Sequence, residues 1–354
     1  MKDYTNRKVF IGIDVHKKSY SIAAICNGSL IKKTTMVADP QVLLSFLHNF
    51  KDAEIETAYE AGFSGFHLHR FLAGNGIKNM VVHPASIEIA SRERVKNDKR
   101  DSLKIATQLC AGRLKSVHVP QCSREDFRLI SRLRNSFVKD RTKKGVQLKS
   151  ILHQLGKIPY DDTTITSKKW IEKVLKMEFS PDQYFVIKCI ADQWMHLTTE
   201  IKKIDVMLNI QAKNDIELEK IYTSIPGFGS IIARVLANEL GDMTQFANER
   251  QLFSYTGLTP REYSSGEHKR LGHISRQGKP ILRKMLIQAA WITIKVDKEF
   301  CELYLAISQK AGKKRAIVAV ARRLIGRVKT CLKEKRPYRI SASAATQSCL
   351  VSTS

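Results

Sequence analysis

The chain has 354 residues and carries 60 lysines and arginines against 34 aspartates and glutamates, a formal charge of +26. Such an excess is costly to hold in a compact protein without a polyanion to neutralise it, so nucleic acid is the favoured partner. Hydrophobic residues make up 43% of the chain, which excludes global disorder. No apolar run approaches the roughly 20 residues of a membrane-spanning helix, so we expect no membrane partner.

The N-terminal third alternates between strand and helix patterns. Asn27-Gly28 is a hairpin turn signal between two strand-like runs, and Asp39-Pro40 combines an N-cap residue with proline at the first helical position. Three antiparallel strands followed by helix, strand, helix, strand and further helices is the element order of an RNase H-like (RuvC-like) α/β fold, which we expect for residues 1–120. The expected strands are residues 9–13, 20–26, 30–36, 56–60 and 77–82, and the expected helices are residues 40–49 and 66–73.

The rest of the chain has an all-α pattern. Residues 121–215 contain two long stretches in which apolar residues recur every three or four positions, which predicts a helix pair or a coiled-coil oligomerisation seam. Residues 156–166 separate the two stretches. A very basic helical domain is expected at residues 216–339, and the tail at 340–354, rich in serine, alanine and threonine, is expected to be disordered. The apolar positions of the first stretch include Leu129, Leu133, Val146, Leu148 and Leu152.

The seven cysteines are scattered and form no CxxC pair. Their odd number and their apolar neighbours predict reduced thiols of a cytoplasmic protein, and neither a disulfide framework nor a zinc site. Residues 1–10 alternate in charge and lack the apolar core of a signal peptide. We therefore expect a cytoplasmic location.

Four carboxylates fall where a two-metal phosphodiesterase site would need them. Asp14 ends the first expected strand and Glu60 ends a later one, while Asp98 and Asp101 lie three positions apart, on one face if the segment is helical. Two hard cations about 4 Å apart require oxygen ligands from several directions. Each residue taken singly is also explained as a turn or helix-cap residue. Asp14, however, interrupts a strongly apolar strand, where a buried charge needs a partner such as a metal.

These carboxylates belong to three motifs, FIGIDVHK at residues 10–17, YEAG at 59–62 and NDKRDSLKIA at 97–106. The motifs resemble those of the DEDD transposases of the insertion-sequence-110 family, which includes the Piv-type DNA invertases. The resemblance implies a RuvC-like acidic tetrad that binds Mg²⁺, or Mn²⁺ in its place. One departure is Ser102-Leu103, where relatives usually carry a small residue first; it touches no proposed ligand. The tetrad would consist of Asp14, Glu60, Asp98 and Asp101.

Two features favour contacts to a phosphate backbone. Cations surround the two aspartates, and such a run is either a solvated face or a phosphate contact. The segment SIPGFGSIIA at residues 224–233 has the form of a helix-hairpin-helix turn, in which Gly227 and Gly229 let backbone N–H groups approach phosphate. Ala233, Leu236 and Leu240 would give its second helix an apolar face. The cations beside the aspartates are Lys96, Lys99 and Arg100.

Three segments of the basic domain are similar to the transposase domain of the same family: LFSYTGLTP at residues 252–260, YSSGEHKRLG at 263–272 and ISRQGKPILR at 274–283. In that family a serine followed by glycine is the proposed nucleophile. On this match Ser265, which precedes Gly266, is the expected nucleophile. The resemblance extends over nearly the whole chain, with the motifs of both domains in the same order.

Other readings of this region stay open. Ser264 is the second choice of nucleophile and Ser275 the third, and a loop serine is otherwise explained as part of a solvated turn. Attack on a phosphodiester requires nearby cations to stabilise the charge on phosphorus. At Lys279 relatives often carry asparagine, so the local match is incomplete. The cations closest in sequence to the serines are Lys269, Arg270, Arg276 and Arg283.

The resemblance implies an insertion-sequence transposase that cleaves and rejoins donor and target DNA. It further implies a noncoding guide RNA, the bridge RNA, a homodimer or homotetramer, and a bacterial or archaeal, nucleoid-associated location. In such an oligomer the serine of one protomer could meet the metal site of another and form a composite active site. Three alternatives share parts of the pattern: a protein-guided DNA invertase of the Piv type, a RuvC-like Holliday-junction nuclease that ignores the serine, and a non-enzymatic DNA-binding protein.

Overall fold

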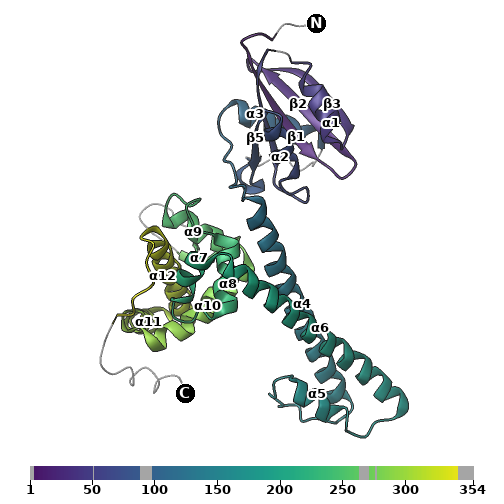
Figure 1. The fold of residues 1–354 in the computed structure, drawn as a ribbon, viewed down its shortest axis with the longest axis vertical. Coiled ribbons are helices and arrows are strands. Elements are labelled where there is room, and N and C mark those ends of the chain that lie inside the picture. Colours follow the sequence, from purple (N-terminus) through teal and green to yellow (C-terminus); the bar gives the residue numbers. More distant parts are fainter. Residues whose placement is uncertain (1–3, 51, 88–97, 263–270, 276, 342–354) are drawn as a thin grey trace. The chain divides into compact units, whose positions relative to one another are not determined.

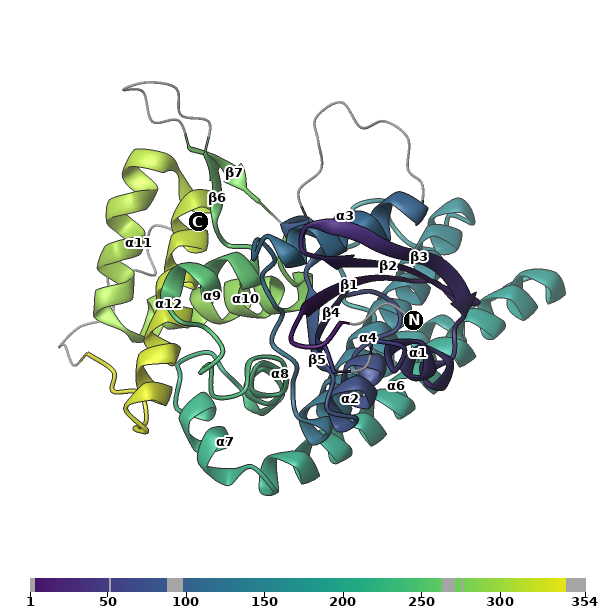
Figure 2. The same cartoon turned by 90° about the horizontal axis from the view of Figure 1, so that it is seen from above.

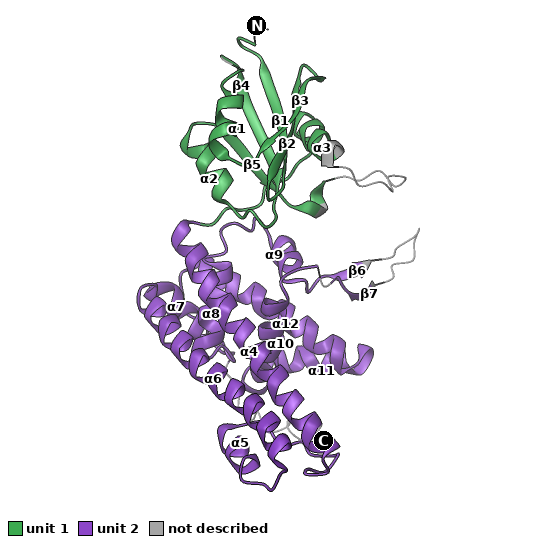
Figure 3. Cartoon of the chain, turned by 90° about the vertical axis from the view of Figure 1, so that its right-hand side faces the viewer, with its two compact units in different colours: residues 1–120 green, residues 121–354 purple. Residues whose placement is uncertain are grey.

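The computed structural model describes residues 4–50, 52–87, 98–262, 271–275 and 277–341. The chain divides into two compact units, Met1–Pro120 and Gln121–Ser354 (Figure 3). Each unit is described by itself below. No helix in the described ranges is long and apolar enough to cross a membrane.

The first unit is built on a five-stranded mixed sheet with the strand order β3-β2-β1-β4-β5 (Figure 2). The first three strands are antiparallel neighbours, whereas β4 pairs parallel with β1 and with β5. The predicted hairpin turn is confirmed, because Asn27 and Gly28 both adopt positive φ angles between β2 and β3. All five predicted strands are confirmed, as β1 Lys8–Val15, β2 Ser19–Cys26, β3 Ser29–Val37, β4 Glu54–Glu60 and β5 Lys78–Val82.

Helices cover both faces of this sheet, which is why β1 and β2 read as nearly continuous apolar runs. Figure 2 shows α3 on one face and α1 and α2 on the other. Asp39 caps α1 as predicted, because its carboxylate accepts a hydrogen bond from the backbone N–H of Gln41 at 2.7 Å. The helical segments are α1 Pro40–Leu47, α2 His67–Gly74, the short 3-10 helix η1 Pro84–Ser86 and α3 Asp98–Cys110.

The second unit begins with the two predicted long helices, α4 Cys122–Gln154 and α6 Pro181–Lys213, which pack side by side (Figure 1). A short helix that the sequence did not indicate, α5 Lys168–Val174, packs against them. The apolar stripe of α4 is only partly buried. Leu148 and Leu152 are buried in the core that the helices share, whereas three other members of the stripe are exposed: Leu129, Leu133 and Val146.

The remainder of the second unit is a helical domain around one large apolar core. The segment after α12 is anchored as far as Ser341, because the Tyr338 hydroxyl donates to Asp297 Oδ2 at 2.6 Å and the Ser341 hydroxyl donates to Asp297 Oδ1 at 2.7 Å. The predicted disordered tail otherwise lies outside the described residues. The elements are α7 Ile216–Thr223, α8 Ser230–Leu240, α9 Glu249–Thr256, β6 Pro260–Glu262, β7 Leu271–Ile274, α10 Pro280–Val296, α11 Lys298–Ala311 and α12 Lys313–Lys333.

The cysteine prediction needs one correction. Five of the seven cysteines are free thiols, as expected, but Cys301 on α11 is disulfide-bonded. Scattered single cysteines carry no spacing signal that would reveal such a bond. The free thiols are Cys26, Cys110, Cys122, Cys189 and Cys331.

Candidate active site and nucleic-acid interface

Asp14 and Glu60 occupy equivalent places on two neighbouring parallel strands. Ile13 of β1 is in register with Tyr59 of β4, and the next residue of each strand is the carboxylate. Because side chains alternate along a strand, Asp14 shares the face of Gly12 and Glu60 shares that of Ala58. This is the face that α3 covers. The two carboxylates therefore lie side by side, at the carboxyl ends of their strands.

The close approach of α3 to β1 places the third carboxylate-bearing segment at the same edge. A Cβ atom on Gly12 would lie 2.1 Å from the carbonyl oxygen of Ser102 and 2.4 Å from the backbone nitrogen of Ala106. Only a glycine lets the helix backbone rest on the strand this closely. Asp101 immediately precedes Ser102 in the first turn of α3, and its carboxylate lies 3.9 Å from Lys104. The first turn of α3 is thus held next to the end of β1.

A histidine and a tyrosine of the same motifs contribute local contacts. Asp14 Oδ2 lies 3.1 Å from His16 Nε2, an interaction that sequence reasoning did not anticipate. The buried Tyr59 donates a hydrogen bond from its hydroxyl to the Gly65 carbonyl oxygen at 3.0 Å, which ties down the turn that follows Glu60. The motif residues around the carboxylates therefore support the ends of the strands.

Carboxylate oxygens are the ligands that Mg²⁺ and Mn²⁺ prefer, so the chemistry of this set fits a divalent cation. Among the described side chains there is no group of three or more His, Cys, Asp or Glu that is arranged to hold a metal. Asp98 begins α3, but its side chain lies outside the described part of the structure. The same holds for the neighbouring cations Lys96, Lys99 and Arg100.

The predicted serine loop is flanked by two short antiparallel strands, β6 and β7. Residues 263–270, between these strands, lie outside the described residues. They include four predicted site residues: Ser264, Ser265, Lys269 and Arg270. Arg276 is also outside them. Ser275 lies at the base of the hairpin, where its backbone N–H donates to the Thr259 carbonyl oxygen at 2.8 Å.

Two glycines cross at the base of this hairpin. A Cβ on Gly278 would lie 2.3 Å from the Gly257 nitrogen and from the Tyr255 carbonyl oxygen. Gly257 ends α9 with a φ of +69°, a left-handed conformation that suits glycine. Arg283, predicted from the sequence as a nucleic-acid contact, donates from Nη1 to the Thr256 carbonyl oxygen at 3.3 Å. The hairpin therefore rises from a tightly packed base.

The segment proposed to touch phosphate connects α7 to α8 through a turn that packs on α10. Gly227 has a φ of +82°, and a Cβ there would lie 2.6 Å from the Ala289 carbonyl oxygen. Gly229 precedes α8, and a Cβ on it would meet no heavy atom within 4 Å. The predicted apolar face of α8 is confirmed, because three residues are fully buried: Ala233, Leu236 and Leu240.

Comparison with known proteins decides the family. Residues 11–156 match the sequence profile of the DEDD-type transposases of insertion sequence IS110, and residues 219–305 match the profile of the IS116/IS110/IS902 transposase family. The chain belongs to this transposase family. It is therefore a DNA recombination enzyme.

Individual relatives align with the transposase over most of its length. The transposase of insertion sequence IS1111A from Coxiella burnetii is 26% identical over 346 residues, which cover 94% of this chain and 92% of the relative. The putative transposase y4qE of Sinorhizobium fredii is 28% identical over 80% of this chain and 72% of its own. The pilin gene-inverting protein of Moraxella lacunata is 22% identical over 94% of this chain and 98% of its own.

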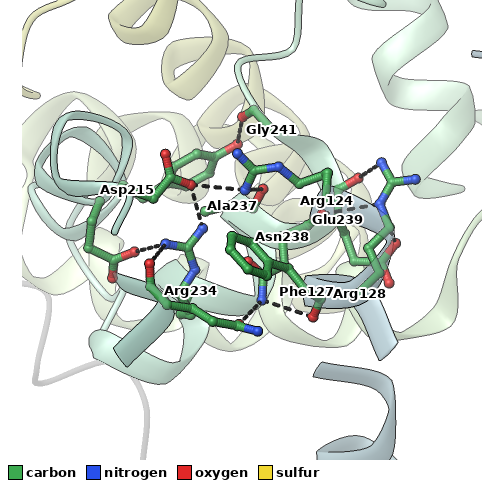
Figure 4. A network of polar contacts seen from close by, with 12 residues as sticks. Arg124, Phe127, Arg128, Asp215, Arg234, Ala237, Asn238, Glu239 and Gly241 are labelled. Carbon is green, nitrogen blue, oxygen red and sulfur yellow. Dashed lines mark hydrogen bonds and ion pairs between the residues drawn. The ribbon is translucent and has the colours of Figure 1, made fainter. Parts of the chain in front are cut away.

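A polar network that sequence reasoning missed joins α4 to α8 in the transposase (Figure 4). Arg124 of α4 and Arg234 of α8 both donate to Asp215 Oδ2 at 2.9 Å. The Asn238 amide donates to the Ser131 hydroxyl at 2.7 Å. The sequence signal for this network is a repeat of arginine at every fourth position of α4, at Arg124, Arg128 and Arg132. This spacing puts the three arginines on one face of the helix.

Proposed function

We propose that this transposase cleaves and rejoins DNA with two chemical devices, a carboxylate-bound divalent cation in an RNase H-like first unit and a serine nucleophile in the second. The adjacent register of Asp14 and Glu60, with the first turn of α3 packed beside them, is the observation that carries the proposal. The strand order 3-2-1-4-5, with three antiparallel strands at one side, supports the RNase H-like assignment.

Asp14, Glu60, Asp98 and Asp101 would hold Mg²⁺, with Mn²⁺ as an alternative. When bound, the cation neutralises negative charge on the phosphodiester and on its attacking and leaving oxygens. The fold would bring these ligands to the cation from different directions. Two of them belong to strand ends, and two belong to the start of a helix that packs closely on β1 at Gly12. Lys96, Lys99 and Arg100 would contact the phosphate backbone beside this site.

In the second unit Ser265 would attack phosphorus. The bond between the serine oxygen and phosphorus forms, the bond between phosphorus and one sugar oxygen breaks, and the released sugar oxygen takes up a proton as the serine gives one up. Attack by a sugar hydroxyl of another strand reverses the step and rejoins the DNA. Cations would stabilise the charge on the phosphoryl oxygens during both steps. Their candidates are Lys269, Arg270, Arg276 and Arg283.

The partners follow from the same proposal. Donor and target DNA would lie along basic surfaces, with backbone N–H groups near Gly227 and Gly229 approaching a phosphate as in a helix-hairpin-helix motif. Exposed apolar residues of α4 would form an oligomer seam, in a dimer or a tetramer. A noncoding guide RNA would pair with both DNA substrates in the cytoplasm, at the nucleoid.

Trapping of a covalent protein–DNA adduct tests the proposal. The protein, with RNA retained from the host, is incubated with Mg²⁺ and DNA that spans an insertion-sequence end, and is then denatured and resolved on a gel. We expect an adduct that Ser265→Ala and Asp98→Ala both abolish and that Ser264→Ala and Ser275→Ala retain. Cleavage without an adduct, undisturbed by Ser265→Ala, would instead identify a metal-dependent nuclease.

Two further outcomes separate the remaining alternatives. A protein-guided invertase, favoured by the similarity to the pilin gene-inverting protein, would recombine DNA after all RNA is digested, whereas an RNA-guided transposase would need the RNA restored. A non-enzymatic DNA-binding protein would form no adduct and make no cut, and substitution of the carboxylates would leave its DNA binding unchanged.

A further inference from the structure

One buried carboxylate in the second unit holds cations from two distant parts of the chain. Only 1% of the Glu239 side chain on α8 is exposed. Its two oxygens accept hydrogen bonds from Arg132 Nε at 2.8 Å and Nη2 at 3.1 Å, and from Lys279 Nζ at 2.7 Å. Arg132 lies on α4, and Lys279 immediately precedes α10. Both meet at Glu239, although they are 107 and 40 positions away from it in the sequence.

Three cations and two carboxylates share this cluster, because Glu125 also acts electrostatically on Arg132. Arg128 also lies 4.0 Å from Glu239, but its guanidinium is buried and is satisfied by the carbonyl oxygens of Asn238 and Glu239. Arg132 and Lys279 differ from it, because 48% and 32% of their side chains are exposed. The cluster therefore presents an excess of positive charge at its exposed side.

Arg132 and Lys279 each have more N–H donors than their hydrogen bonds to Glu239 use. A guanidinium has five N–H donors, and Glu239 takes two of those on Arg132. The ammonium of Lys279 has three donors and uses one on Glu239. Both side chains are oriented by hydrogen bonds to a buried carboxylate, so an anionic partner would bind without first ordering them.

The cluster is fixed next to β6 and β7, the two strands that flank residues 263–270. The backbone N–H of Lys279 donates to the Tyr255 carbonyl oxygen at 3.1 Å, directly beside the crossing of Gly257 and Gly278. The Lys279 ammonium also lies 5.6 Å from the centre of the Tyr255 ring. An anion on this cluster would therefore lie close to the crossing of Gly257 and Gly278.

We propose that Arg132 and Lys279 bind a backbone phosphodiester of the nucleic acid, and that Glu239 acts as a positioning residue that holds the two cations ready for it. A role of this phosphate contact in strand cleavage rests on the function proposed above, whereas phosphate binding does not require serine chemistry. A planar guanidinium and a compact ammonium on one carboxylate are the groups that proteins use to bind phosphate oxygens.

Lys279→Ala tests the phosphate contact. The fluorescence anisotropy of a labelled DNA duplex is measured over a range of salt concentrations, with all proteins carrying Ser265→Ala so that the result is independent of the serine chemistry. Loss of one phosphate contact should weaken binding about tenfold near 0.1 M salt and reduce the slope of log K against log salt by about 0.9. Lys295→Ala is the matched control, because Lys295 is an exposed lysine in the last turn of α10, the helix that Lys279 precedes.

The same titration with an RNA duplex of equal length identifies the source of the phosphate. A reduced slope for Lys279→Ala with DNA assigns the contact to DNA, and a reduced slope with RNA alone assigns it to RNA. The proposal is overturned if neither slope changes, or if Lys295→Ala reduces the slope equally.

Glu239→Gln distinguishes a positioned site from bulk charge. This substitution removes a negative charge, so a purely electrostatic surface would bind nucleic acid more tightly. A positioned site would bind severalfold more weakly, because Arg132 and Lys279 lose the carboxylate that orients them. Circular dichroism confirms that the variant is folded. Tighter binding by the folded variant would contradict the positioning role, and Lys279→Ala tests the phosphate contact independently should the variant not fold.

Discussion

Gly12 of β1 lies against Ser102 of α3 so closely that a single added carbon on Gly12 would come within 2.1 Å of the Ser102 carbonyl oxygen. The three atoms nearest to an added carbon are all backbone atoms, one of Ser102 and two of Ala106, and so cannot be moved by a side-chain rotation. This contact sets the distance between the strand that carries Asp14 and the helix that carries Asp98 and Asp101.

Gly12→Ala should therefore displace α3 and separate the carboxylates. We expect a loss of about 1–3 kcal/mol in the free energy of unfolding, typical of overpacking, and at least a tenfold loss of DNA cleavage at a temperature where the variant is folded. Thermal unfolding and a cleavage assay measure the two effects. Gly74→Ala is the control in the same unit, because a Cβ on Gly74 meets no heavy atom within 4 Å. Wild-type cleavage by Gly12→Ala would show that the position of α3 is unimportant.

Asp14→Asn and Glu60→Gln should each weaken binding of a divalent cation and abolish cleavage, because each removes a charged oxygen ligand at the adjacent strand ends. Mn²⁺ binding is followed by electron paramagnetic resonance in the absence of DNA, which separates metal binding from catalysis. Glu54→Gln is the control, because Glu54 is at the opposite end of β4 and pairs with Lys8 at 3.1 Å. Undiminished Mn²⁺ binding by both site variants would rule out this metal site.

The stability of the second unit should depend on the charge of Glu239. Burial alone would raise the pKa of Glu239, but the ion pairs with Arg132 and Lys279 outweigh burial and leave its pKa below the ordinary value. A carboxyl with a lowered pKa in the folded state stabilises the protein above its unfolded pKa of about 4.3, and this contribution is lost as the pH falls through the folded pKa. Unfolding by urea at pH 7 and pH 3 should show a larger acid loss in the wild type than in Glu239→Gln. Equal losses would mean that the carboxylate makes no such contribution.

Two glycines of the turn between α7 and α8 should respond differently to alanine. At Gly227 the φ of +82° and the contact with Ala289 make alanine unfavourable, so we expect a loss of about 1–3 kcal/mol in unfolding free energy. Gly229→Ala has open space and should cost less, about 0.5–1 kcal/mol, because alanine is a poorer N-cap than glycine at the start of α8. If N–H groups at this turn bind phosphate, Gly229→Ala should still weaken DNA binding. An equal loss of stability in both variants would contradict this distinction.

Mixing of inactive variants tests whether an active site is shared between protomers. If the carboxylates of one protomer act with the serine of another, an Asp14→Ala protein mixed with a Ser265→Ala protein should regain part of the recombination activity. Differently tagged chains allow the mixed assembly to be verified by co-purification. Verified mixed assemblies without any activity would place both devices in one protomer.

Much of the fold was predictable because it is encoded locally. The apolar patterns of β1 to β5, the Asn27-Gly28 turn and the Asp39 cap are decided by residues close together in sequence. The positions of Asp14 and Glu60 at strand ends follow from the same local pattern. α5 escaped prediction because it has only seven residues, too few to show a helical period.

The sequence by itself determined the element order, the carboxylates at the strand ends and the excess of positive charge, since periodicity and composition are properties of the linear chain. Tertiary structure alone decided that Gly12 seats α3 on β1, that Gly257 crosses Gly278, and that Glu239 gathers Arg132 and Lys279. The physical reason is distance along the chain. A contact between residues 21 to 107 positions apart depends on how whole elements pack, and no local pattern records that packing.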